Sequence, residues 1–175
     1  VGLSRDDMGN VPESQIAQSP EELLAQAKVL GAFNHQRMRE KAIGMLESLA
    51  QRNLLAAEDQ FLLARLQSQL GEDAGAWPKT RARLKTLTLS QPRNPRFLAF
   101  AAHMHLRNKE FNDAEPLIAR LEQLETERKT LAGALGSIEL RGKSLELRGQ
   151  GSQAAALWKS YAEQPESSPA RKLLL

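Results

Sequence analysis

The chain contains no cysteine, a single tyrosine and few aromatic residues, which make up 5% of its 175 positions. The lack of cysteine excludes disulfide bonds, thiolate zinc sites and a cysteine nucleophile, and it is compatible with any compartment. Valine and isoleucine are also scarce, and the apolar residues are mostly leucine and alanine. Because leucine and alanine favour helices, and a sheet of this size would carry more β-branched residues, the composition predicts an all-helical fold.

Patterns of catalytic and metal-binding chemistry are missing as well. The chain has no glycine-rich phosphate loop, no dinucleotide-binding glycine pattern, no HExxH and no GxSxG. Of its three histidines, His35 falls in a predicted turn, and His103 and His105 lie two positions apart on one predicted helix. An i,i+2 pair points to different helix faces and cannot chelate a metal. We therefore expect a non-catalytic protein with no metal and no cofactor.

No apolar run approaches the ~20 residues that span a membrane, and no signal-peptide pattern is present. Hydrophobic residues make up 41% of the chain, which is enough for a core, and the net charge is only +3. Residues 1–18 are polar with interspersed glycine and proline, which is typical of a linker or arm. Residues 166–175 predict a tail that starts a further helix. Because the chain begins at Val1, we expect it to be a piece of a longer protein.

Between these ends, apolar residues recur at helical spacing and predict eight helices. The clearest start signals are Ser19-Pro20 with Glu22, which forms a capping-box pattern, and Asn94-Pro95. Asn112 or Asp113 is expected to cap the sixth helix, and Gly71 and Gly149 are expected to end the third and the seventh. The helices pair into hairpins at about 19–52, 55–91, 94–127 and 130–164.

One pattern repeats in the second helix of every hairpin: a small residue, followed by large ones four and seven positions later. The sets are Ala42/Leu46/Leu49, Thr80/Leu84/Leu87, Ala114/Ile118/Leu121 and Ala154/Trp158/Tyr161. The first helices carry a matching small residue, at Ala27, Ala64, Ala102 and Gly142. Small residues let two helices approach closely, and the larger ones fill the gap to the next hairpin.

This pattern resembles the tetratricopeptide repeat, a helix–turn–helix unit of about 34 residues. The resemblance covers about residues 20–165. The third and fourth hairpins match without gaps, whereas the first and second need a few extra residues near His35 and Glu72. The resemblance implies a right-handed superhelical solenoid of about four antiparallel hairpins over residues 19–165, which serves as a scaffold for binding other proteins.

The resemblance also implies that the first helices line a concave groove, into which the residue after each small position points. These residues are Lys28, Arg65, His103 and Lys143, and neighbouring groove positions are Phe61, Arg96 and Arg107. We expect an acidic peptide or protein segment to dock there through charge-assisted hydrogen bonds. Ordinary surface charge is the alternative, since charged residues make up 26% of the chain.

A basic stripe lies on the fourth predicted helix, and no acidic residue occurs between positions 74 and 96. Its members are Lys79, Arg81, Arg83 and Lys85. The stripe is either a solvated helix face or a surface for RNA or anionic membrane. It lacks the interleaved aromatic residues of single-strand binders, and the chain lacks a one-base-per-repeat code, so nucleic acid and membrane are the less favoured partners. A structural or homo-oligomerisation role inside a larger protein is the other alternative.

Overall fold

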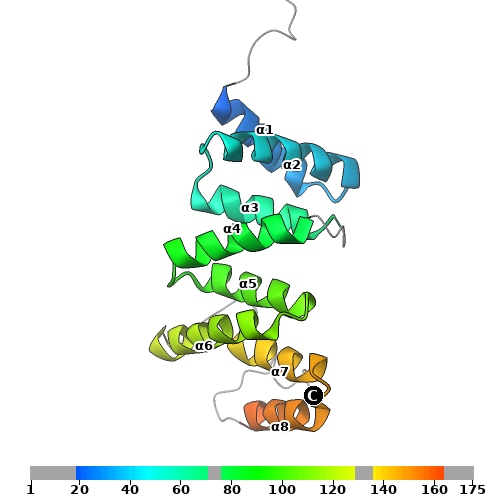
Figure 1. Ribbon diagram of the computed structural model, residues 1–175, viewed down its shortest axis with the longest axis vertical. Helices are drawn as coiled ribbons and strands as arrows, with labels where there is room; N and C mark the ends of the chain where they lie inside the picture. The colour runs from blue at the N-terminus through cyan, green and yellow to red at the C-terminus, as the bar shows by residue number, and fades with distance from the viewer. Residues whose placement is uncertain (1–18, 71–75, 129–135, 164–175) are drawn as a thin grey trace, which may run out of the picture. The chain divides into compact units, whose positions relative to one another are not determined.

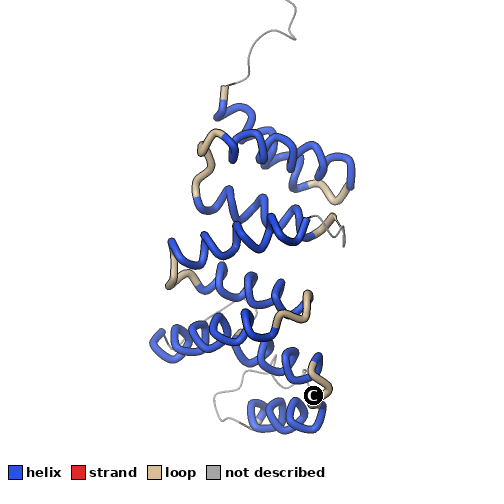
Figure 2. The backbone as a smooth tube through the Cα atoms, viewed as in Figure 1, coloured by secondary structure: helices blue, strands red, loops and turns tan. Residues whose placement is uncertain are grey.

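The computed structural model describes residues 19–70, 76–128 and 136–163. Helices fill most of these ranges, and no strand occurs within them (Figure 2). The helices are α1 (Pro20–Ala32), α2 (Gln36–Gln51), α3 (Ala57–Ser68), α4 (Ala76–Ser90), α5 (Pro95–Arg107), α6 (Phe111–Arg128), α7 (Ser137–Leu147) and α8 (Gly151–Ala162). The all-helical prediction is confirmed over these ranges. The predicted linker at 1–18, the tail at 166–175 and the Gly71 stop lie outside them.

The chain divides into two compact units, Val1–Asp59 and Gln60–Leu175, with the boundary inside α3. In the first unit, α1 packs against α2. In the second, α5 packs against α6 and α7 against α8, as expected of hairpins, and α5 also contacts α4 and α7. Figure 1 shows α5 with α4 on one side and α6 and α7 on the other. The central helix of the second unit is therefore α5.

Two helix starts use the caps that the sequence predicts. The Ser19 hydroxyl accepts from the Glu22 N–H at 3.2 Å, and the Glu22 carboxylate accepts from the Ser19 N–H at 3.0 Å. Asn94 caps α5 through its side-chain oxygen. The prediction for α6 is wrong, because this helix begins at Phe111, before Asn112 and Asp113. The Glu110 carbonyl already accepts from the N–H groups of Asp113 and Ala114, so the turn into the helix occurs earlier.

Three of the described helices end in the same backbone turn. Asn53, Lys109 and Gly149 follow α2, α5 and α7 with positive φ angles of 56°, 58° and 75°. At the end of α5, the Lys109 N–H bonds to the carbonyl three residues back at 3.0 Å, and the Glu110 N–H bonds to the His105 carbonyl at 2.9 Å. This pair of bonds is the Schellman motif. The predicted stop at Gly149 is confirmed, and the turn after α5 fixes the position of Glu110.

The repeated small and large residues form the core of each unit. All eight small positions are buried: Ala27, Ala64, Ala102, Gly142, Ala42, Thr80, Ala114 and Ala154. In three of the four sets the large residues are at most 1% exposed: Leu46, Leu49, Leu84, Leu87, Ile118 and Leu121. Trp158 and Tyr161 in the last set are half-buried. The positions that repeat in the sequence are therefore the positions that form the core.

The start of α7 is held by α6. Its own N-cap is Gly136, which has no side chain to offer. Instead the Glu125 carboxylate accepts from the Ser137 N–H at 2.8 Å and from the Ser137 hydroxyl at 2.5 Å. A carboxylate at a helix N-terminus also complements the helix dipole. Glu125 thus fixes the start of α7 against α6.

We expect Glu125→Ala to lower the free energy of unfolding by about 1–2 kcal/mol, the usual effect of losing a helix cap. Glu122→Ala is the control on the same helix. It removes an exposed ion pair with Arg141 and should cost less than about 1 kcal/mol. Urea unfolding followed by circular dichroism measures both, and equal losses would contradict the cap.

Candidate binding face on α5

The seven predicted groove residues are distributed over both units. Lys28 on α1 belongs to the first unit, where its Nζ lies 2.7 Å from Oδ1 of Asp59. The Lys28 side chain is 51% exposed and that of Asp59 only 9%, so the lysine neutralises a buried carboxylate. Lys28 therefore already has a counter-ion within the first unit, and the other six predicted groove residues belong to the second unit.

In the second unit, α5 carries Arg96, Phe100, His103 and Arg107 at intervals of four, three and four residues, which places them along one side of the helix. Arg65 lies on α3, and Lys143 lies on α7, which contacts α5. We call the following five residues the basic face: Arg65, Arg96, His103, Arg107 and Lys143.

Aromatic rings support one end of this face. The Phe61 ring stacks on Phe97 with centroids 4.9 Å apart and meets Phe100 edge-on at 5.2 Å. The Arg96 guanidinium lies over the Phe61 ring, 4.7 Å from its centroid. Phe61 is only 3% exposed, so it does not form the open apolar anchor that the sequence suggests. Its ring instead supports Arg96, which a ligand would meet first.

Much of the positive charge on the basic face has no counter-ion within the part of the chain that the structure describes. Among the described residues, Arg65, Arg107 and Lys143 contact no carboxylate. The best partner of Arg107 is the Ser68 carbonyl, at 3.4 Å. Lys143 is half-buried. An anion bound at this face would be attracted to it through a contact that is screened by less water than at a fully exposed site.

His103 lies between Arg96 and Arg107 along α5, and its ring differs from an ordinary surface histidine in hydrogen bonding and in pKa. Its Nδ1 is buried and has no hydrogen-bond partner among the described residues. Burial lowers the pKa of His103, and the charges of Lys143 and Arg107 lower it further. The imidazole is therefore neutral at neutral pH, and it adds a polar group but no charge to the face.

The four residues of the basic stripe on α4 differ in their contacts. Arg81 forms ion pairs with Glu110 at 3.4 Å and with Asp113 at 2.8 Å. Arg83 donates to the Gln67 side chain at 2.6 Å. Lys79 and Lys85 are exposed. Two of the four stripe residues are thus engaged in contacts within the protein.

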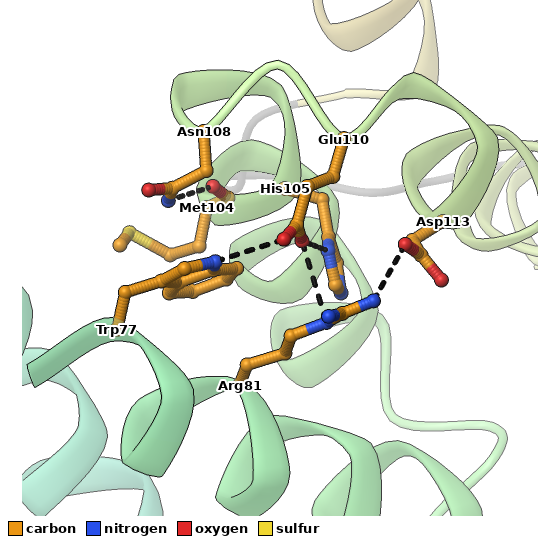
Figure 3. Close-up of polar contacts among 7 residues, drawn as sticks. All are labelled: Trp77, Arg81, Met104, His105, Asn108, Glu110 and Asp113. Atoms are coloured by element: carbon orange, nitrogen blue, oxygen red, sulfur yellow. Dashed lines mark hydrogen bonds and ion pairs between the residues drawn. The ribbon is translucent and has the colours of Figure 1, made fainter. Parts of the chain in front are cut away.

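A second polar cluster surrounds His105 (Figure 3). His105 lies two positions after His103, so the two side chains point to different faces of α5. The Trp77 indole N–H donates to the Glu110 carboxylate at 3.0 Å, and the same carboxylate contacts His105 Nδ1 at 2.7 Å. Arg81 then links Glu110 to Asp113, and the Trp77 and His105 rings meet edge-on at 5.4 Å. The sequence does not predict this cluster, since nothing in the spacing of these residues marks them as partners.

His105, Glu110 and Asp113 also present possible metal-ligand atoms within 4.8 Å of one another. The Arg81 guanidinium, however, contacts both carboxylates. A divalent cation would have to displace this resident cation from them. The cluster is therefore best understood as an ion network that joins α4 to the turn between α5 and α6.

None of the described helices is long and apolar enough to cross a bilayer. Comparisons with family models, curated proteins and solved structures gave no match for this chain.

Proposed function

We propose that the protein is a non-catalytic scaffold of the tetratricopeptide type, which docks an acidic peptide or protein segment on the basic face. The repeat assignment is supported by the four register-matched sets of small and large residues that form the cores. Units of this kind bury their apolar faces against their neighbours and stack into a right-handed solenoid.

The uncompensated cations of the basic face carry the proposal. Elsewhere in the second unit, several arginines contact carboxylates, as Arg93 does with Glu127 and Arg141 with Glu115 and Glu122. On the basic face, Arg65, Arg107 and Lys143 contact no carboxylate of the described residues. Carboxylates of a partner would form charge-assisted hydrogen bonds with these groups.

A structural or oligomerisation role is the second candidate, and an observation on the first unit favours it. Val29 on α1 and Phe33, which directly follows this helix, are 60% and 55% exposed. Exposed apolar side chains of this size are common at surfaces that pack against another chain. RNA or membrane binding through the basic stripe has less support, because Arg81 and Arg83 are engaged within the protein.

The test compares two charge reversals of equal size. We expect Arg65→Glu/Lys143→Glu to weaken binding of a fluorescein-labelled hexaglutamate peptide by at least about tenfold, because two charge-assisted contacts become repulsive. Lys79→Glu/Lys85→Glu, on the basic stripe, makes the same change in net charge and should weaken binding much less. Fluorescence anisotropy at two salt concentrations measures both, since ionic contacts weaken with salt.

Equal weakening by the two double variants would mean that only net charge matters, and the basic face would be the wrong assignment. Affinity capture from lysate with the wild-type protein and the Arg65→Glu/Lys143→Glu variant would then follow. A protein that is captured by the wild type and lost with the variant would be the natural candidate for the docked partner.

A further inference from the structure

The centre of the basic face brings three groups together that act on one another. His103 and Arg107 lie one turn apart on α5, and Lys143 lies on α7, which packs against α5. Both cations act on the imidazole, since each lowers its pKa. His103 and Lys143 directly follow Ala102 and Gly142, the buried small residues of their helices. These small residues allow the close packing of the helices and thereby hold the three groups together.

The free protein favours the neutral form of His103 for three reasons. The ring is half-buried, it lies near two cations, and its Nδ1 is covered without a hydrogen-bond partner among the described residues. A covered nitrogen without a partner costs less as a bare lone pair than as an N–H that finds no acceptor. We therefore assign the proton of the neutral ring to Nε2.

We infer that His103, Arg107 and Lys143 form an oxyanion subsite that takes up a proton from solvent together with its ligand. This inference rests on the proposed function and specifies its centre. A carboxylate or phosphate oxygen docked at Arg107 and Lys143 cancels the field of the two cations and adds a negative charge beside the ring. A half-turn of the imidazole about its Cβ–Cγ bond moves Nδ1 out of its covered position, so that Nδ1 can also carry a proton.

Glu139 lies one turn before Lys143 on α7, but the charges that shift the pKa of His103 are those of Lys143 and Arg107. Arg81 of α4 and the carboxylates of Glu110 and Asp113 gather around His105 (Figure 3). His105 points to a different face of α5 from His103, because the two are two positions apart. From α3, the basic group of the face is Arg65, whose charge has the same sign as those of Arg107 and Lys143. An incoming anion is thus the group that reverses the sign of the field at His103.

Thermodynamic linkage determines whether anion binding strengthens or weakens as the pH falls. If the anion raises the proton affinity of His103, protonation raises the anion affinity by the same factor. Binding therefore strengthens as the pH falls through the range in which the bound form gains its proton. One coupled proton changes the affinity by at most about tenfold for each pH unit.

The experiment uses the whole chain and two probes of equal length, a hexaglutamate peptide and a hexapeptide with one phosphoserine. We expect hexaglutamate to bind several-fold more tightly at pH 6.0 than at pH 7.5 at constant ionic strength. Calorimetry in two buffers with different ionisation enthalpies should show uptake of up to about one proton. Nuclear magnetic resonance of the His103 ring should show its pKa rising when the peptide binds. Tighter binding of the phosphoserine peptide at pH 7.5 would identify phosphate as the preferred oxyanion.

The variants separate this inference from the proposed function. His103→Gln keeps an N–H donor but cannot titrate, so it should bind hexaglutamate equally well at both pH values. His35→Gln, at an exposed histidine of the first unit, should retain the wild-type pH dependence. If Arg107→Glu/Lys143→Glu abolishes binding but wild-type binding is independent of pH, the proton coupling is wrong and the docking face stands. A pH dependence that persists in His103→Gln also overturns the coupling. If the wild type binds neither peptide, both proposals fall.

Discussion

Gly142→Ala is expected to lower the free energy of unfolding by about 3 kcal/mol, although alanine is the better helix former. A Cβ atom at this position would lie 2.1 Å from Cζ2 and 2.6 Å from Cε2 of Trp158. The indole is a rigid plane, and its N–H donates to the Glu146 carboxylate at 3.3 Å, so it cannot move aside freely. The steric cost should therefore exceed the gain of ~1 kcal/mol that helix propensity alone would give.

Gly44→Ala provides the matched control. Gly44 is also in a helix, α2, but a Cβ there would meet no atom within 4 Å. This variant should be more stable than the wild type by about 0.5–1 kcal/mol, so the two substitutions should have opposite signs. Trp158→Ala in the Gly142→Ala background should recover part of the loss, which a double-mutant cycle would measure. If Gly142→Ala also stabilised the protein in urea unfolding, the close contact between α7 and α8 would be wrong.

The second large effect is expected at Glu110, where removal of one carboxylate takes the partner from Trp77 and His105 and one of two partners from Arg81. Glu110→Ala should lower the free energy of unfolding by about 2–3 kcal/mol, because the Trp77 indole N–H and the buried His105 both lose their partner. Arg81 retains Asp113, so its loss is smaller. Glu110→Gln keeps one acceptor oxygen and should cost less than the alanine variant.

Asp113→Ala is the control within the same cluster. It removes the exposed ion pair with Arg81 alone and should cost less than about 1 kcal/mol. Urea unfolding monitored by tryptophan fluorescence measures the series, and Trp77 reports directly on its own hydrogen bond. A loss at Glu110→Ala no greater than that at Asp113→Ala would show that the cluster contributes little to stability.

The sequence predicts most of the local structure of this protein because helix periodicity and caps are local properties. Ser19 and Asn94 cap their helices as predicted, and the small and large positions of the repeat are buried in register. The predicted caps of α6 fail for a local reason too: the turn after Lys109 brings Glu110 into the capping position.

Long-range polar partners are harder to predict. The chain has 21 acidic residues, and the sequence does not distinguish Glu110 and Glu125, which join helices, from those that only face solvent. In the candidate site, too, the sequence does not predict which cations have a counter-ion. Lys28 occupies the same repeat position as His103 and Lys143, yet it is neutralised by Asp59, a partner that depends on how α1 packs.

The two histidines of α5 show how this scaffold can evolve. His105 is held in a network with Trp77 and Glu110, so selection for folding should keep it unchanged. Two positions earlier, His103 belongs to a face on which Arg65 and Arg107 are exposed and have no carboxylate partner among the described residues. Substitutions there cost little stability. If the face docks a ligand as proposed, single substitutions there can change the ligand preference while the His105 side of the same helix maintains the fold.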